Sequence, residues 1–143
     1  MEIETQKDIT REFFRMKALR IEKTRRIAEL ILDRPPVNAM DGELLAELAQ
    51  ACASLERDNA VHGVLVRGEG KCLSAGLDLA AVVALDRAAA EAFFARFDAA
   101  FAAALAFDKP MAVAVDGHAI AGGMVLALCV TSLLSAAART RSG

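Results

Sequence analysis

The sequence contains no tryptophan, no tyrosine and few cysteines or histidines, and this excludes several kinds of site at the outset. The three cysteines, Cys52, Cys72 and Cys129, are odd in number and lack the spacing of metal ligands. His62 and His118 have no cysteine or histidine partner at ligand spacing either. We therefore expect no metal site, and we expect reduced thiols, as in a cytoplasmic protein.

A strong charge of either sign is also absent. The chain has 17 basic and 19 acidic residues, so its net charge of −2 gives no reason to expect nucleic acid or an anionic membrane surface as a partner. Basic residues gather in Arg15–Arg26, but acidic residues are interspersed with them, which is typical of a solvated charged face. At 143 residues the chain is long enough for one globular domain with a buried core.

Charged residues are missing altogether from one long segment. The twenty residues Ala119–Ala138 are uncharged, which is long enough to cross a membrane as a helix. The glycines, threonine and serines within this segment favour a short helix and a strand of a soluble protein, and the membrane-associated alternative stays open. The start of the chain carries Glu2, Glu4 and Asp8 instead of an apolar run, so we expect no signal peptide.

The first third of the chain is expected to begin with a helix and a hairpin. Ile9, Phe13 and Met16 lie at helical spacing in a charged background, which predicts a short amphipathic helix. The segments Ala18–Glu22 and Ile27–Leu32 read as two strands joined by a tight turn.

The rest of the chain alternates between helices and strands. Asp41 is a good N-cap for a helix over Gly42–Arg57, whose leucines form one apolar stripe. The further predicted elements are a strand Val61–Val66, helices Leu77–Leu85 and Ala88–Phe107, a strand Met111–Val115 and a helix Ala121–Cys129. In the helix Ala88–Phe107, Leu105 and four phenylalanines lie at helical spacing, and the phenylalanines are interpreted as core: Phe93, Phe94, Phe97 and Phe101. This alternation predicts a layered α/β domain.

Two strand-to-helix junctions are the candidate functional segments. Gly70–Leu79 and Asp116–Met124 each follow an expected strand and place small residues at or just before the start of a helix. The first N–H groups of a helix have no partner within it, and small residues let a ligand oxygen approach them. Two such junctions facing each other would give two N–H donors to one oxygen, which stabilises an enolate or oxyanion.

Each junction also has a simpler interpretation. The pair Gly122 and Gly123 is typical of close packing between a helix and a strand. Asp78 is equally typical of a carboxylate in the first turn of a helix.

Taken together, four segments resemble the enoyl-CoA hydratase/isomerase (crotonase) family. They are Leu32–Ala39, Leu55–Asp58, Gly70–Leu79 and Lys109–Leu128, with Ser-Ala-Gly-Leu-Asp-Leu and Gly-His-Ala-Ile-Ala-Gly-Gly as the most specific stretches. The resemblance runs from Ala18 to Cys129 and corresponds to about the first half of a typical member. It implies an α/β fold of the crotonase-like (ClpP/crotonase) type, a stack of ββα units that is incomplete at the C-terminus.

The resemblance also implies a ligand and a site. The ligand would be an acyl-CoA thioester, with coenzyme A as part of the substrate and no covalently bound cofactor. The catalytic donors would be the backbone N–H groups of Leu77 and Gly122. The residues implied for the adenine and pantetheine path are Val37, Asn38, Ala39, Ser74, Ala75, Gly76, Leu77 and Asp78. An intact family member is expected to be a homo-oligomer.

One departure from the family pattern bears on the reaction. Hydratases of the family usually carry a glutamate at the position of Val125, so the water-activating carboxylate is absent. An apolar residue there, with Leu77 in the Ser-Ala-Gly-x-Asp stretch, is more similar to the Δ3,Δ2-enoyl-CoA isomerase branch, whose base comes later in the chain. We therefore expect a double-bond isomerase that is truncated before its catalytic glutamate. The alternative is an inactive fragment that retains coenzyme A or partner binding.

The resemblance divides the chain into three parts. Residues 1–17 would be an N-terminal helical extension, 18–129 the crotonase-like core and 130–143 an atypical tail. We hypothesise that the tail is a frameshift product, which the coding DNA would refute if the shifted frame contained no family-like sequence.

Overall fold

The structure is a computed structural model that describes residues 11–115, 117–119, 122–129 and 132–135. Helices and strands alternate through most of these ranges. In chain order they are β1 (Arg11–Arg15), β2 (Leu19–Thr24), β3 (Ile27–Leu32), α1 (Gly42–Arg57), β4 (Gly63–Gly68), β5 (Cys72–Ser74), α2 (Leu79–Val83), α3 (Arg87–Leu105), β6 (Met111–Val115), β7 (His118–Ala119), α4 (Gly122–Cys129) and β8 (Ser132–Ser135).

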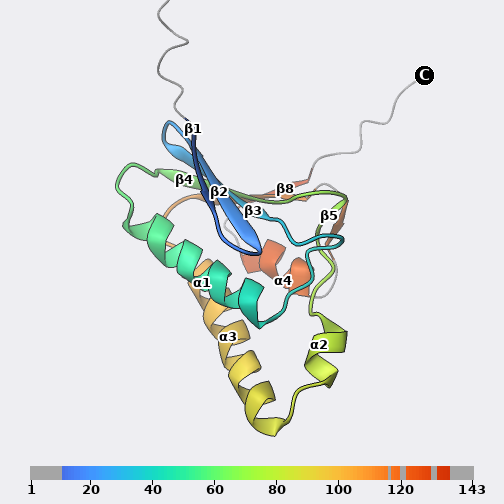
Figure 1. Cartoon of the computed structure of the whole chain (residues 1–143). Helices are drawn as coiled ribbons and strands as arrows, with labels where there is room; N and C mark the ends of the chain where they lie inside the picture. Colours follow the sequence, from blue (N-terminus) through green and yellow to red (C-terminus); the bar gives the residue numbers. More distant parts are fainter. Residues whose placement is uncertain (1–10, 116, 120–121, 130–131, 136–143) are drawn as a thin grey trace, which may run out of the picture.

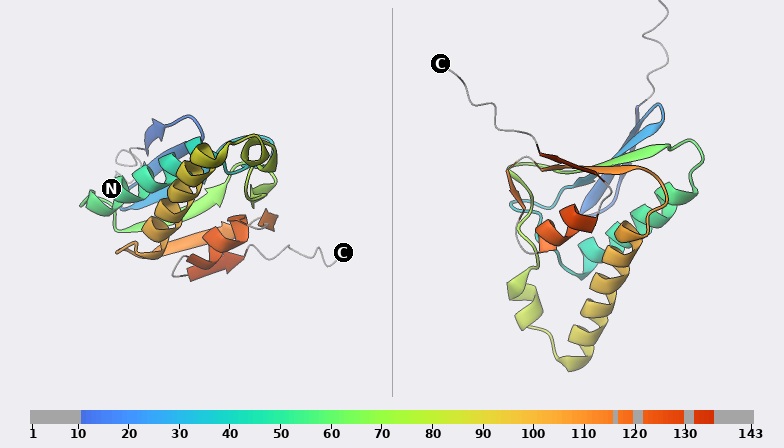
Figure 2. Two further views of the ribbon diagram at one scale, coloured as in Figure 1. Left: turned by 90° about the horizontal axis from the view of Figure 1, so that it is seen from below. Right: turned by 180° about the vertical axis from the view of Figure 1, so that it is seen from behind.

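A six-stranded sheet forms one layer and the helices form the other. Its strand order is β1-β2-β3-β4-β6-β8, and β5 and β7 make a separate two-stranded sheet. The first three strands are antiparallel, whereas β3, β4, β6 and β8 run parallel. Figures 1 and 2 show α1, α3 and α4 on the same face of the large sheet. The predicted layered α/β architecture is confirmed.

The predicted hairpin of the second and third strands is confirmed with a tighter turn than expected. Thr24 pairs with Ile27, so only two residues form the turn. Arg25, the first of them, has a φ of 55°. A positive φ in a two-residue turn matches the twist of the flanking strands.

The expected N-terminal helix is wrong where the structure describes it. Residues Arg11–Arg15 form strand β1, which pairs antiparallel with β2, and Ile9 lies outside the described residues. The helical spacing rested on three apolar residues, and a helix that short is marginal in water. As a strand the same residues gain backbone hydrogen bonds to β2, although all five of them are exposed.

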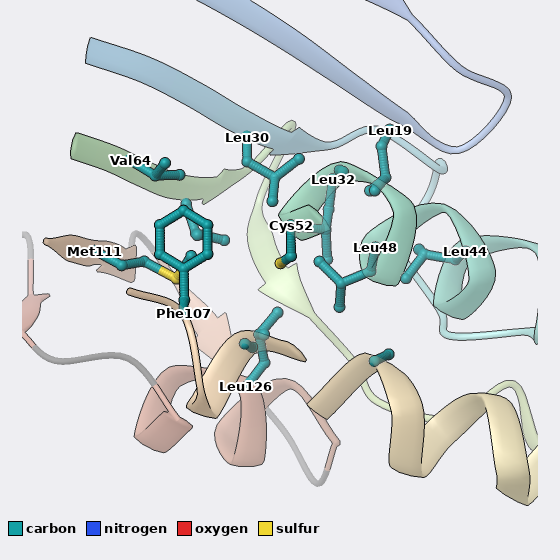
Figure 3. Close-up of a cluster of buried hydrophobic side chains, with 14 of the residues drawn as sticks. Leu19, Leu30, Leu32, Leu44, Leu48, Cys52, Val64, Phe107, Met111 and Leu126 are labelled. Carbon is teal, nitrogen blue, oxygen red and sulfur yellow. The ribbon is translucent and has the colours of Figure 1, made fainter. Parts of the chain in front are cut away.

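Helix α1 forms as predicted because its cap and its stripe agree. The Asp41 carboxylate accepts a hydrogen bond from the Leu44 N–H at 2.9 Å, which satisfies one of the unpaired donors of the first turn. All of the predicted stripe is buried: Leu44, Leu45, Leu48, Ala51 and Leu55. The stripe belongs to one core with side chains of the sheet and of α4, and Figure 3 shows Leu44 and Leu48 of α1 with Leu126 of α4 in this core.

The prediction that the apolar stripe of α3 is core is only partly confirmed. Phe93 and Phe101 are buried and Phe97 is partly buried against the core, but Phe94 is 46% exposed. Phe94 follows Phe93 directly, so its side chain points about 100° around the helix from that of Phe93. It packs edge-to-face on Phe93 with ring centroids 5.3 Å apart, so part of its surface is still covered.

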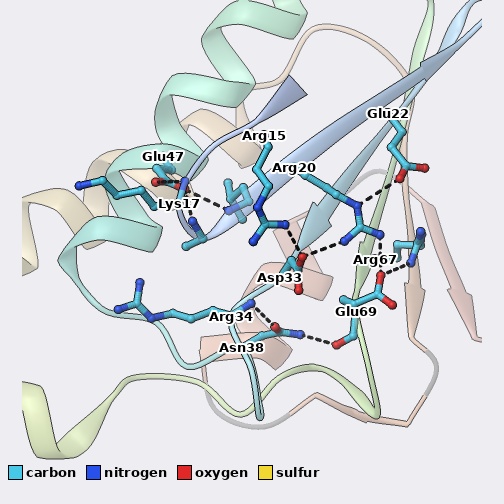
Figure 4. Close-up of polar contacts among 12 residues, drawn as sticks. Arg15, Lys17, Arg20, Glu22, Asp33, Arg34, Asn38, Glu47, Arg67 and Glu69 are labelled. Carbon is cyan, nitrogen blue, oxygen red and sulfur yellow. Dashed lines mark hydrogen bonds and ion pairs between the residues drawn. The ribbon is translucent and has the colours of Figure 1, made fainter. Parts of the chain in front are cut away.

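The sheet face opposite the helices carries a network of ion pairs (Figure 4). Arg20 donates to Glu22 at 3.1 Å, to Asp33 at 2.9 Å and to Glu69 at 2.6 Å. The Arg15 guanidinium also bonds Asp33 and lowers the pKa of that carboxyl, and Arg20 lowers the pKa of Glu69 in the same way. The network links strand β2 to the loop after β4, which leads to the candidate site.

The long uncharged segment does not form a long helix in the part that is described. Helix α4 has eight residues, and no helix among the described residues is long and apolar enough to cross a membrane. Residues 120–121, 130–131 and 136–138 of the segment lie outside the described residues.

Candidate active site

The two strand-to-helix junctions lie side by side. Strands β5 and β7 pair in parallel, with Cys72 opposite His118 and Ser74 opposite Ala119. Each strand leads directly towards a helix, β5 towards α2 and β7 towards α4. The two segments that precede α2 and α4 therefore lie next to each other, as two donors to one oxygen would require. The two short strands that create it were not predicted.

Gly117 makes this pairing possible. Its φ is +100°, and a β-carbon there would lie 1.9 Å from the Lys71 carbonyl oxygen. No side chain fits at that distance, so the chain before β7 can approach β5 only with glycine at this position.

The Leu77 N–H points away from its neighbouring strand. The Met40 N–H donates to the Gly76 carbonyl at 2.7 Å, and the Met40 carbonyl accepts from the Asp78 N–H at 2.9 Å. These two bonds, one on each side of Leu77, form an isolated parallel β-bridge between Met40 and Leu77. In a trans peptide the N–H points opposite to the carbonyl of the same plane. Since the Gly76 carbonyl faces Met40, the Leu77 N–H faces the other way, and it bonds no residue of the described chain.

Helix α4 begins next to β5. A β-carbon on Gly123 would lie 2.4 Å from the Ser74 carbonyl oxygen, so this glycine serves close helix–strand packing, as the simpler interpretation held. Gly122 is the first residue of α4, and the N–H of a first helical residue has no partner within the helix. The start of this helix also carries the positive end of its dipole.

Asp78 is the N-cap of α2. Its carboxylate accepts from the Ala81 N–H at 3.2 Å, so the simpler interpretation also applies here. The predicted start of this helix, Leu77, is wrong, and α2 begins at Leu79. Asp78 is the extended cap residue, and Leu77 is held in the bridge to Met40.

The remaining residues implied for the coenzyme A path differ in their exposure. Val37 is 40% exposed, and Ala39 and Ala75 are half-buried. Asn38, Ser74 and Gly76 are buried, and the side chains of Asn38 and Ser74 bond protein groups. These three residues would therefore contact a ligand through main-chain atoms, or affect its binding by holding neighbouring residues in place.

The thiols do not add a nucleophile to the site. All three cysteines are free, and burial raises the pKa of the Cys52 thiol to about 11 and also raises the pKa of Cys129. The Cys72 sulfur lies 3.4 Å from the Val37 carbonyl oxygen, to which it donates. Within the described ranges, no group of three or more histidine, cysteine, aspartate or glutamate side chains is arranged to hold a metal.

At Val125 and Asp78, two described positions of the candidate site, no free carboxylate is available to act as an acid or base. Val125 on α4 is apolar and 42% exposed, and the Asp78 carboxylate is engaged as a helix cap. Two backbone donors aimed at one oxygen are an arrangement that stabilises negative charge on a carbonyl oxygen.

Comparison with known proteins decides the family. The sequence pattern of the enoyl-CoA hydratase/isomerase family matches residues 22–139. The chain belongs to the enoyl-CoA hydratase/isomerase family. The match extends ten residues beyond Cys129, and part of that stretch forms β8, which pairs in parallel with β6. The proposed division of the chain at 17 and 129 and the frameshift origin of the tail stay predictions.

Curated members of the enoyl-CoA hydratase/isomerase family are similar over most of this chain. The probable enoyl-CoA hydratase echA8 of Mycobacterium bovis is 30% identical over 117 residues, covering 81% of this chain and 45% of the relative. The crotonyl-CoA hydratase of Syntrophomonas wolfei is 34% identical over 111 residues, covering 76% and 43%. The chain spans about half the length of these relatives.

A solved structure gives the same picture of the fold. DspI of Pseudomonas aeruginosa superposes with a TM-score of 0.80 at 32% identity, over 86% of this chain and 47% of that protein. The crotonase-type α/β fold is therefore confirmed, with this chain corresponding to a part of it. The signal that could have located the pairing of β5 with β7 in the sequence is Gly117, which had been interpreted only as part of a junction.

Proposed function

We propose that this chain binds an acyl-CoA thioester and polarises its carbonyl through the backbone N–H groups of Leu77 and Gly122. The observation that carries the proposal is the bridge at Met40, which turns the Leu77 N–H away from Met40 and leaves it without a partner in the described chain, next to the pairing of β5 with β7. The family membership supports a thioester as the ligand.

Backbone donors suit this chemistry because the charge that develops is on one oxygen. An enolate or tetrahedral intermediate of a thioester carries that charge where the two N–H groups would meet. Removing one such donor typically costs about 3 kcal/mol of transition-state stabilisation. Val37, Ala39 and Ala75, which are at least partly exposed, would face the coenzyme A portion through main-chain atoms and small side chains.

For the reaction of the whole protein we propose double-bond isomerisation in preference to hydration. Hydration needs a group that activates water, and Val125 offers none at the position where the family's hydratases usually carry glutamate. The two curated relatives described above are named as hydratases, so this finer proposal rests on Val125 and on Leu77 in the Ser-Ala-Gly-x-Asp stretch.

Infrared spectroscopy of a bound thioester tests carbonyl polarisation. Crotonyl-CoA labelled with ¹³C at the thioester carbonyl should show a lower carbonyl stretching frequency when bound than in buffer, because hydrogen bonds weaken the C=O bond. Unlabelled crotonyl-CoA in excess should abolish the shifted band. A labelled ligand that binds with its band at the buffer position would contradict the proposed site.

Introducing a carboxylate at Val125 tests the preference for isomerisation. We expect the wild-type chain to form no 3-hydroxyacyl-CoA from crotonyl-CoA, and Val125→Glu to form it slowly. The gain should stay below the roughly hundredfold effect of a fully assembled general base. Leu128→Glu is the matched control, because it adds the same charge to an exposed position of the same helix. Hydration by the wild-type chain, or equal hydration by both variants, would refute the preference.

A second candidate function is binding without turnover. It is favoured by the absence of a free carboxylate at the positions just described, since Asp78 caps α2 and position 125 is valine. A shifted carbonyl band with neither hydration nor double-bond migration would identify this case.

A further inference from the structure

Ser74 lies between the two halves of the candidate site. Its side chain is fully buried, at 0% exposure. The Ser74 hydroxyl donates to the Asn38 carbonyl at 2.7 Å and accepts from the Gly76 N–H at 3.0 Å. Its backbone carbonyl is the atom against which Gly123 of α4 packs. One residue therefore contacts the segments that carry both proposed donors.

Asn38 fixes the partner of that hydroxyl. Its φ is 52°, and its side-chain amide nitrogen lies 3.1 Å from each of three carbonyl oxygens, those of Glu69, Cys72 and Leu73. Its side-chain oxygen accepts from the Arg34 N–H at 2.8 Å. The loop after β3 and the approach to β5 are thus joined through one buried side chain (Figure 4).

The peptide that carries the Leu77 N–H depends on these contacts because it follows a glycine. Gly76 has a φ of +89°, a conformation that glycine adopts as one of many. Two bonds hold it: its N–H donates to the Ser74 hydroxyl, and its carbonyl accepts from the Met40 N–H at 2.7 Å. Without the first bond, the φ of Gly76 would lose its own restraint, and the direction of the Leu77 N–H would depend on the two bonds to Met40 alone.

We infer that Ser74 is a positioning residue for the Leu77 N–H and that Asn38 holds Ser74 in place. The effect on a bound carbonyl rests on the proposed function, whereas the orientation of the Leu77 N–H does not. The Ser74 hydroxyl never touches the ligand; it sets the orientation of the Gly76–Leu77 peptide, and thereby the polarisation of a bound carbonyl. Nothing in this role requires a change in how tightly the coenzyme A portion binds.

Two variants and one control separate positioning from general stability. Ser74→Ala removes both hydroxyl bonds. Asn38→Gly removes the side-chain amide while keeping a backbone at φ 52° unstrained. Cys52→Ala is the control, since it removes a buried side chain of α1 that makes none of these bonds.

The first readout needs no ligand. The orientation of the Leu77 N–H vector is measured in ¹⁵N-labelled protein from its residual dipolar coupling. We expect it to change in Ser74→Ala and in Asn38→Gly but not in Cys52→Ala. An unchanged vector in Ser74→Ala would overturn the inference whatever a ligand does.

The second readout is the carbonyl band of bound, labelled crotonyl-CoA, compared at equal occupancy. Weakening one donor should lower the thioester's hydrogen-bonded population by about three- to tenfold in Ser74→Ala, with little change in binding of coenzyme A itself. Where the wild-type chain shows a shifted band, a reoriented vector with the same band in Ser74→Ala would also overturn the inference. If the wild-type chain shows no shifted band while the vector reorients, the proposed function fails and the positioning of the peptide by Ser74 is supported.

Discussion

Gly117→Ala is expected to destabilise the fold by more than about 3 kcal/mol and to abolish carbonyl polarisation. The new β-carbon would lie 1.9 Å from the Lys71 carbonyl oxygen and 3.0 Å from the Lys71 carbonyl carbon, and both are backbone atoms that no change of rotamer can move. The clash falls at the pairing of β5 with β7, on which the closeness of the two junctions depends. Urea denaturation followed by circular dichroism measures the loss.

Gly70→Ala is the matched control for this change. Gly70 also has a positive φ, +86°, but a β-carbon there would have nothing within 4 Å. It should cost only the roughly 1–2 kcal/mol of placing a side chain in the left-handed region. Equal losses in the two variants would mean that backbone conformation, and not the approach of the two strands, explains the glycine at position 117.

Leu77→Pro is expected to remove one of the two proposed donors while leaving its surroundings in place. Proline has no N–H, and the preceding residue is Gly76, which has no β-carbon to clash with the proline ring. The Gly76 carbonyl can still accept from Met40. In infrared spectra of bound crotonyl-CoA, roughly half of the carbonyl shift should be lost. Where turnover can be measured, the rate should fall by about 100- to 1,000-fold.

Leu77→Ala separates the donor from the side chain. Alanine keeps the N–H and removes most of a half-buried leucine, so the carbonyl shift should stay close to that of the wild-type chain. If Leu77→Ala loses the shift as fully as Leu77→Pro, the leucine side chain and not its N–H makes the contact. If neither variant changes the shift, Leu77 has no part in binding the carbonyl.

Much of the helical layer could be predicted because local signals and burial agree. Helix α1 has a capping aspartate at its start and leucines spaced so that one face is apolar, and both features act as expected. Strand β6 was predicted with its observed limits, Met111–Val115, because an apolar run of that length follows a proline.

The errors arise where a local pattern depends on a partner far along the chain. All five residues of β1 are exposed, including Phe13 and Phe14, so its sequence has no alternation of buried and exposed residues that would predict a strand. Only its pairing with β2 makes it a strand. Strands β5 and β7 have three and two residues, too few for any periodicity, and they exist because Cys72 and Ser74 meet His118 and Ala119. The exposure of Phe94 likewise depends on where α1 lies, which helical spacing does not encode.

For the candidate site, the resemblance indicated two segments that the structure brings together, but not which groups each side chain bonds. Asn38 and Ser74 were expected to line the path of coenzyme A, and the structure buries both side chains in bonds to the main chain. Single residues do not reveal this, because an asparagine or a serine near a ligand and one within a loop look alike in sequence.

The direction of the Leu77 N–H has a consequence for how mutations can affect this protein. A group that belongs to the main chain is encoded by every codon except those for proline, so almost any amino acid at position 77 leaves the donor in existence. Single-nucleotide changes can therefore damage it mainly by misdirecting it, through Gly76, Ser74 or Gly117. The least tolerant positions should be small residues around the donor, and the residue that carries the donor should be among the more tolerant.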